Sequence, residues 1–316
     1  MSFEDIVHEI KKRDKILITT HINPEGDAIG SSLALAIALS SIGKKVSVYT
    51  ADPVPTALKF LPHIEMVQQV KKVSERFDAV IVVDCGDLER VGFLKPDNIP
   101  ADVLLNVDHH ITNNNFGTFN LVEEVVAAAE LVYRIIKELK IPVTSDIAAC
   151  IYTAILTETG SFRYQNTDLN AFKIAEDMVS SGANPWAIAE QVYNRNSNGR
   201  IKLIGQILAN IGISDNGRIS WIIVREEMYR DTGTTKEDVE DIINFPRSIE
   251  GVEVAVLFRE SQNDWKISLR SNGKVDVSAV AMEFGGGGHT MASGFFIKGD
   301  LEDVKKRVIG RVEKSL

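Results

Sequence analysis

The chain has 316 residues, a length that suggests two domains, and 44% apolar with 25% charged residues is ordinary for a globular protein. No apolar run approaches the roughly 18 residues of a membrane span, and the charged stretch up to Lys15 does not resemble a secretory signal. The formal net charge of −9, with scattered Lys and Arg, argues against binding of long duplex nucleic acid. Two cysteines, Cys85 and Cys150, are too few for a disulfide scaffold, so we expect a cytoplasmic protein.

The first half of the chain alternates apolar runs with helical patterns. Continuous apolar runs predict buried strands over residues 15–20, 45–49, 78–83 and 102–107. Residues 27–42 have the pattern of a helix, which Gly43 should end. Apolar residues at helical spacing then predict helices around 131–139, 145–156, 168–181 and 186–194. We therefore expect an α/β domain with a parallel sheet covered on both faces, followed by a helical cap.

The second half has a different pattern. A polar stretch at 194–199 indicates a boundary, giving domains over residues 1–195 and 196–316. Asn216-Gly217 predicts a hairpin within 213–221, and strands are expected at 252–259 and 265–270, joined by a turn over 261–264. Helices are expected at 201–210, 238–245, 277–283 and 301–312. The second domain should therefore be a smaller α+β domain.

His and carboxylate residues follow the predicted strands of the first domain. His21, Glu25 and Asp27 lie between the first strand and its helix, Asp84 follows the third strand, and Asp108-His109-His110 follows the fourth. Ligands of open α/β sheets bind beyond the carboxyl ends of the strands, so these side chains should share one edge. Glu158, after an apolar helix, adds another acid.

This set of side chains has the chemistry of a metal site. His, Asp and Glu without thiolates suit Mn²⁺ or a related divalent ion. Six such groups exceed the needs of one metal, and two ions about 3.5–4 Å apart can clamp a phosphoryl group, with Asp84 as the candidate bridge. Structural explanations remain open at this point, because a lone Asp at a strand end often caps a helix or turn, and Gly26 and Gly30 would suit close helix packing.

A glycine-rich segment stands out in the second domain. Gly285, Gly286, Gly287 and Gly288 precede His289. Glycine lets backbone N–H groups approach phosphate oxygens, and Arg270 at a strand end could add a bidentate contact. A flexible connection with no binding role remains the alternative.

Taken in order, the motifs resemble those of the DHH phosphoesterase family, which is named for the triplet seen here as Asp108-His109-His110. More narrowly, the chain resembles the bacterial nanoRNase and pAp-phosphatase subgroup, in which a DHH-associated C-terminal domain follows the DHH domain. The resemblance extends from the His21 motif through Asp84, the triplet and Thr157-Glu-Thr-Gly160 to the Gly285–His289 segment.

The resemblance implies a role for each of these residues. His21, Glu25 and Asp84 would hold one metal, and Asp27, Asp84, His109 and Glu158 the other. His110 would face the substrate phosphate, and Asp108 would support the imidazoles from behind. Arg270, the four glycines and His289 would bind the nucleotide, which places the active site in a cleft between the domains. Glu25 and Glu158 stand where the family usually has Asp, and Glu is longer by about 1.5 Å.

The implied activity is hydrolysis of phosphodiester and phosphomonoester bonds in very short oligoribonucleotides and in 3′-phosphoadenosine 5′-phosphate (pAp). A metal-activated hydroxide would attack phosphorus, with two Mn²⁺ ions as the expected cofactors and Mg²⁺ or Co²⁺ as alternatives. A phosphodiesterase of cyclic or linear dinucleotides and a non-catalytic nucleotide-binding module stay open. No membrane partner is expected, and a homodimer is only the base-rate expectation.

Overall fold

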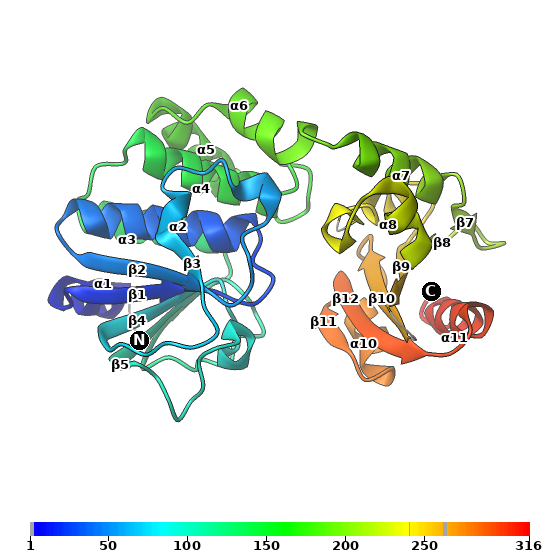
Figure 1. The fold of residues 1–316 in the computed structure, drawn as a ribbon, viewed down its shortest axis with the longest axis horizontal. Coiled ribbons are helices and arrows are strands. Elements are labelled where there is room, and N and C mark those ends of the chain that lie inside the picture. The colour runs from blue at the N-terminus through cyan, green and yellow to red at the C-terminus, as the bar shows by residue number, and fades with distance from the viewer. Residues whose placement is uncertain (1–2, 240, 262–263) are drawn as a thin grey trace. The chain divides into compact units, whose positions relative to one another are not determined.

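The computed structural model describes residues 3–239, 241–261 and 264–316. It divides the chain into two compact units, Met1–Arg195 and Asn196–Leu316, each built on one six-stranded sheet (Figure 1). Within the described ranges, no helix is both long and apolar enough to cross a membrane. The expected turn at 261–264 includes residues 262–263, which lie outside these ranges.

The sheet of the N-terminal unit is parallel throughout, as predicted. Its strands lie in the order β3-β2-β1-β4-β5-β6, and every neighbouring pair is parallel. The bounds are β1 Lys15–Thr19, β2 Lys45–Thr50, β3 Val67–Gln69, β4 Phe77–Val83, β5 Ala101–Asp108 and β6 Phe119–Val122. The order changes direction between β1 and β4, and such a switch point leaves a crevice at the carboxyl ends of the two strands.

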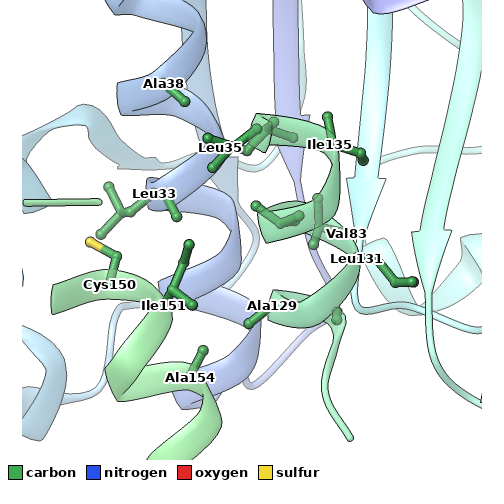
Figure 2. Close-up of a cluster of buried hydrophobic side chains, with 14 of the residues drawn as sticks. Leu33, Leu35, Ala38, Val83, Ala129, Leu131, Ile135, Cys150, Ile151 and Ala154 are labelled. Atoms are coloured by element: carbon green, nitrogen blue, oxygen red, sulfur yellow. The ribbon is translucent and has the colours of Figure 1, made fainter. Parts of the chain in front are cut away.

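Helices cover one face of this sheet, and irregular segments cover the other. The helices are α1 Phe3–Lys12, α2 Gly26–Ser41, α3 Ala128–Glu138, α4 Ser145–Glu158, α5 Leu169–Ser180 and α6 Pro185–Ala189, followed by a π-helical turn, Glu190–Asn194. Side chains of α2, α3, α4 and β4 form one buried apolar cluster (Figure 2). The opposite face packs against Cys85 and the 3₁₀ turn Leu88–Val91, so the sheet is covered on both faces, as expected.

The C-terminal unit has a mixed sheet in the order β11-β12-β10-β9-β8-β7, in which only β8 and β9 pair in parallel. Its strands are β7 Gly212–Ile213, β8 Ile219–Val224, β9 Val254–Ser261, β10 Asp264–Ser271, β11 Gly287–His289 and β12 Ala292–Lys298. One face packs against α10 Val277–Glu283 and α11 Leu301–Glu313. The other face packs, over β8 and β9, against α7 Asn198–Leu208, α8 Glu226–Thr232 and nearby turns.

Local predictions in this unit have mixed outcomes. The Asn216-Gly217 hairpin is confirmed, because β7 and β8 pair antiparallel around it and Gly217 has a positive φ of 69°. The helix expected at 238–245 is wrong: a 3₁₀ turn, Lys236–Val239, and the short helix α9 Asn244–Arg247 flank turns at 241–243. Pro246 explains part of this break, because proline is tolerated only in the first turn of a helix and α9 places it there.

Candidate functional site

Three adjacent strands of the N-terminal sheet lead into His or Asp residues. β1 leads to His21, β4 to Asp84, and β5 ends at Asp108, which two histidines follow. Since β1, β4 and β5 are neighbours in a parallel sheet, their carboxyl ends lie along one edge. The candidate site therefore lies at the switch point of the strand order, where ligands of such sheets bind.

Asp84 is at the centre of the group. Its carboxylate oxygens lie 3.6 Å from Nε2 of His21, 3.4 Å from Nε2 of His109 and 3.7 Å from Nδ1 of His110. Nε2 of His109 is also 3.8 Å from the Asp27 carboxylate. Potential ligand atoms of Asp84, His109 and His110 all lie within 4.8 Å of one another, a spacing at which one metal ion can be held.

Two of these imidazoles are oriented from behind by the backbone. Nδ1 of His21 donates to the carbonyl oxygen of Ile22 at 2.7 Å, and Nδ1 of His109 donates to that of Val125 at 3.2 Å. A carbonyl oxygen can only accept, so each Nδ1 carries the proton and each Nε2 faces the carboxylates. This is the arrangement that metal-ligating histidines use in proteins, with the outer nitrogen anchored and the inner one directed at the metal.

Asp84 itself is held in an unusual conformation. Its φ of 56° lies in the left-handed region, which is uncommon for a non-glycine residue, while its backbone N–H still bonds to the carbonyl of Val107 at 2.9 Å. The side chain is buried, and its Oδ1 atom has no hydrogen-bond partner among the described residues. Buried carboxylate oxygens normally have partners, so an unpaired one facing two imidazoles indicates a position for a cation.

The charges of the site also favour binding of a cation. Burial and the charge of Asp84 raise the pKa of Asp27 to about 6. Burial and the charges of Asp27 and Asp84 likewise raise the pKa of Glu158 well above its ordinary value. Burial opposes protonation of His109, but Asp84 and Asp27 outweigh it and raise its pKa to about 10. Burial also opposes ionisation of Asp84, yet interactions with His109 and His21 lower its pKa.

This donor set fits divalent metal ions. The buried carboxylates of Asp27 and Asp84 and the half-buried one of Glu158 repel one another, and oxygen and imidazole donors without thiolates are the ligands that Mn²⁺ and similar ions accept. Glu25 immediately precedes α2, and its charge adds to the raised pKa values of His21 and Glu158. Of the six residues expected as metal ligands, measured distances bring together His21, Asp27, Asp84 and His109, whereas Glu25 and Glu158 stay predicted ligands.

Close packing of α2 on α4 places Asp27 beside Glu158. A Cβ atom added to Gly26 would lie 2.1 Å from Oγ1 of Thr157, and one added to Gly30 would lie 2.6 Å from the carbonyl oxygen of Cys150. These helices touch through their backbones because glycine occupies both positions. The first turn of α2 therefore lies against the last turn of α4, where Asp27 and Glu158 are located.

Asp27 also completes a helix far along the chain. Its carboxylate accepts hydrogen bonds from the backbone N–H groups of Ala128 at 2.6 Å and Ala129 at 3.0 Å, and from Oγ of Ser31 at 2.7 Å. Helix α3 begins after Ala127, which has no side chain that could cap it. Asp27 therefore caps α3 from another helix, and these bonds fix the orientation of its carboxylate.

A buried polar network holds Asp108, as the expected supporting role requires. Oδ1 of Asp108 accepts from Nδ1 of His110 at 2.7 Å, and Oδ2 accepts from Nδ2 of Asn113 at 2.6 Å. The same Asn113 nitrogen donates to Oδ1 of Asn106 at 2.8 Å, and Asn106 in turn donates to the Cys85 carbonyl. Neither Asn106 nor Asn113 is among the residues predicted from the sequence, although Asn106 interrupts an otherwise apolar strand run.

The predicted nucleotide-binding residues of the C-terminal unit share one edge of its sheet. Gly287 to His289 form the edge strand β11 rather than an open loop, and their binding role stays a prediction. Arg270 of β10 lies opposite Ala292 of β12, which in turn lies opposite His289. Arg270 and His289 thus lie in one row across three strands.

Comparison with known proteins identifies the families to which the two domains belong. The model of the DHH family, N-terminal domain, matches residues 15–155, and that of the DHHA1 domain matches residues 219–314. The chain is 33% identical to the bifunctional oligoribonuclease and PAP phosphatase NrnA of Thermus thermophilus, over 95% of this chain and 90% of that protein. The protein of the same name from Bacillus subtilis is 25% identical, over 92% and 91% of the two chains.

A solved structure agrees with the family assignment. The crystal structure of an exopolyphosphatase-related protein from Bacteroides fragilis superposes with a TM-score of 0.90 and 29% identity, covering 99% of this chain and 95% of that one. The chain thus has the domains and the length of these relatives. It belongs to the DHH phosphoesterase family and is a hydrolase that joins a DHH domain to a DHHA1 domain.

Proposed function

We propose that this protein hydrolyses phosphodiester bonds in very short oligoribonucleotides and removes the 3′-phosphate of pAp, using two divalent ions, most readily Mn²⁺. The observation that carries the proposal is the buried convergence of imidazoles and carboxylates on Asp84, whose Oδ1 has no hydrogen-bond partner among the described residues. The substrate assignment is supported by two relatives named as bifunctional oligoribonuclease and PAP phosphatase.

In this proposal each residue has a defined task. His21, Glu25 and Asp84 would hold one ion, and Asp27, Asp84, His109 and Glu158 the other. Bound there, the ions would activate water and offset negative charge on the phosphoryl oxygens. His110, whose Nδ1 proton is fixed by Asp108, presents its Nε2 to a substrate phosphate. Arg270, the segment Gly285–Gly288 and His289 would bind the rest of the nucleotide.

The test measures release of mononucleotide from pApA and of phosphate from pAp, with Mn²⁺ and with a chelator. Asp84→Ala should lose turnover on both substrates and keep the far-ultraviolet circular dichroism of the wild type, because it removes the central ligand. The matched control is Asp102→Ala, at the opposite end of the same sheet, where the carboxylate is exposed and contacts Arg76. Full activity of Asp84→Ala would reject the proposed site.

Other outcomes separate the alternatives. Metal-dependent turnover of cyclic dinucleotides with neither pApA nor pAp accepted would assign a dinucleotide phosphodiesterase. Binding of pAp without turnover in the presence of Mn²⁺ would assign a nucleotide-binding module, and Glu25→Asp with Glu158→Asp would then be the variants to make. The cytoplasmic location, the homodimer and the position of the site between the domains stay predictions.

A further inference from the structure

Over β10, one face of the C-terminal sheet is polar and the opposite face belongs to the apolar core. Along β10, Trp265, Ile267 and Leu269 are buried against α10 and α11. Successive side chains of a strand point to opposite faces, so Lys266 and Arg270 lie on the other side of the sheet. We refer to this surface of β10, β11 and β12, with Arg259 of β9, as the basic sheet face.

The strand register arranges the basic sheet face in three rows. The first row contains Arg259, Lys266 and Phe296, and the second contains Ser268, Gly294 and Gly287. The third contains the Arg270 and His289 pair already described, with Ala292 between them. The middle row consists of small residues, so its backbone forms the floor between two rows of long side chains.

No apolar core covers these rows in the described part of the chain. On this side of the sheet, the buried apolar cluster joins helices α7 and α8 and the turns at Val239 and Ile243 to β8 and β9, and it includes no residue of β10, β11 or β12. Phe296 is 61% exposed although it lies in the middle of a strand. An added Cβ at Gly287 would meet nothing within 4 Å, so the floor is open at β11, whereas one added at Gly294 would lie 2.8 Å from the carbonyl oxygen of Ile267.

The charge of the face differs from that of the whole chain. Its three rows contain Arg259, Lys266, Arg270 and His289 and no carboxylate, and the next row on the same face pairs Asp264 with Lys298. The face is therefore net positive, whereas the chain has a formal net charge of −9. Cationic side chains next to an exposed aromatic ring on a sheet surface are typical of single-stranded nucleic-acid binding, in which bases stack on the ring and phosphates contact the cations.

We propose that the row of Arg259, Lys266 and Phe296 binds a second nucleotide of the substrate, with the cations on its phosphate and Phe296 against its base. The proposal rests on the oligoribonuclease function above and adds residues that select for more than one nucleotide. Lys266 and Arg270 are four positions apart on β10, a distance of about 13–14 Å at about 3.4 Å per residue. The two rows can therefore hold two different groups of one bound oligonucleotide.

The test compares substrates of increasing length on the full chain with Mn²⁺. For Phe296→Ala and Lys266→Ala, we expect KM for pApA and pApApA to rise at least about fivefold, as loss of a base stack or a phosphate contact predicts, with kcat and KM for pAp unchanged. Lys173→Ala is the control, because this position is exposed on α5 in the other unit, and it should leave all three substrates unaffected.

Two results would overturn the inference. The row is not a second nucleotide site if Phe296→Ala and Lys266→Ala leave KM for pApA unchanged. The same holds if they raise KM for pAp as much as KM for pApA. Absence of turnover by the wild type on all three substrates would instead reject the proposed function. Equilibrium binding of pAp and pApA to the same variants then tests the second nucleotide site separately from catalysis. A loss of affinity confined to pApA would still support that site.

Discussion

The contact between α2 and α4 makes a quantitative prediction, because glycine is required there by a backbone atom. In Gly30→Ala, the new Cβ would lie 2.6 Å from the carbonyl oxygen of Cys150 and 3.0 Å from Cβ of Ala154. Neither atom can rotate away, so one helix has to move. Such overpacking costs about 1–3 kcal/mol, and a displaced backbone belongs at the upper end. The higher helix propensity of alanine relative to glycine stabilises the helix by about 1 kcal/mol and offsets part of this cost.

The expected net loss is therefore about 2 kcal/mol in the free energy of unfolding of the N-terminal unit. For a domain of this size, each kcal/mol lowers Tm by about 2–4 °C, so the transition should fall by about 4–8 °C. Since Asp27 and Glu158 lie on the helices that separate, kcat/KM on pAp should also fall at least about tenfold, as displacement of reacting groups predicts.

Calorimetry and steady-state assays on the same preparations would measure both effects. The control is Gly205→Ala in α7, an exposed helical glycine whose added Cβ would meet nothing within 4 Å. It should stabilise the C-terminal unit by up to about 1 kcal/mol and leave kcat/KM unchanged. A Gly30→Ala protein with wild-type Tm and activity would refute the view that backbone contact between α2 and α4 positions the acids.

Two further predictions concern the site itself. In a chelator, the unfolding free energy of the N-terminal unit should fall as pH rises from 5 to 8, because the folded pKa of Asp27 is raised from 3.8 to about 6 and that of Glu158 is also raised. The folded pKa of His109 is raised from 6.5 to about 10 and has the same effect on stability. The stability that these groups contribute below their unfolded pKa values is therefore lost as pH rises. Thermal melts in EDTA at the two pH values measure this, and a higher Tm at pH 8 would contradict it. Asn113→Ala should lower kcat on pAp about tenfold with KM within about twofold, because Asp108 loses the donor that positions it against His110. Asn114→Ala is the neighbouring control, and equal kcat values for the two variants would count against this role for Asn113.

Much of the fold could be predicted from the sequence because the central strands are continuous apolar runs. β1, β4 and β5 are buried on both faces, which makes their ends, and the His and Asp residues that follow, easy to locate. Helix α1 was missed because its buried Ile6, Val7 and Ile10 lie among charged residues. The edge strand β11 was missed because its glycines have no strand preference of their own, and pairing with β12 forms it.

The site was predicted in part for a similar reason. Residues next to strand ends could be found by position along the chain, and family resemblance supplied their roles. The contacts that support these residues could not be predicted, because they join segments that only the tertiary structure brings together. Nothing near Asp108 in sequence shows that Asn113 turns back to it, and nothing near Asp27 shows that its carboxylate meets α3. The rows of the basic sheet face depend on strand register, which a one-residue slip would change entirely.

The bond from Asp27 to the start of α3 has a consequence for how the N-terminal unit folds. Helix α3 cannot satisfy its first backbone N–H groups with its own side chains, and the acid that does so lies 101 residues earlier. Its first turn is therefore completed only when α2 has docked, a contact of long sequence separation that tends to form late and slowly. A fragment that lacks α2 should have an α3 frayed at its beginning, and a chain that has formed this helix fully has already placed one acid of its site.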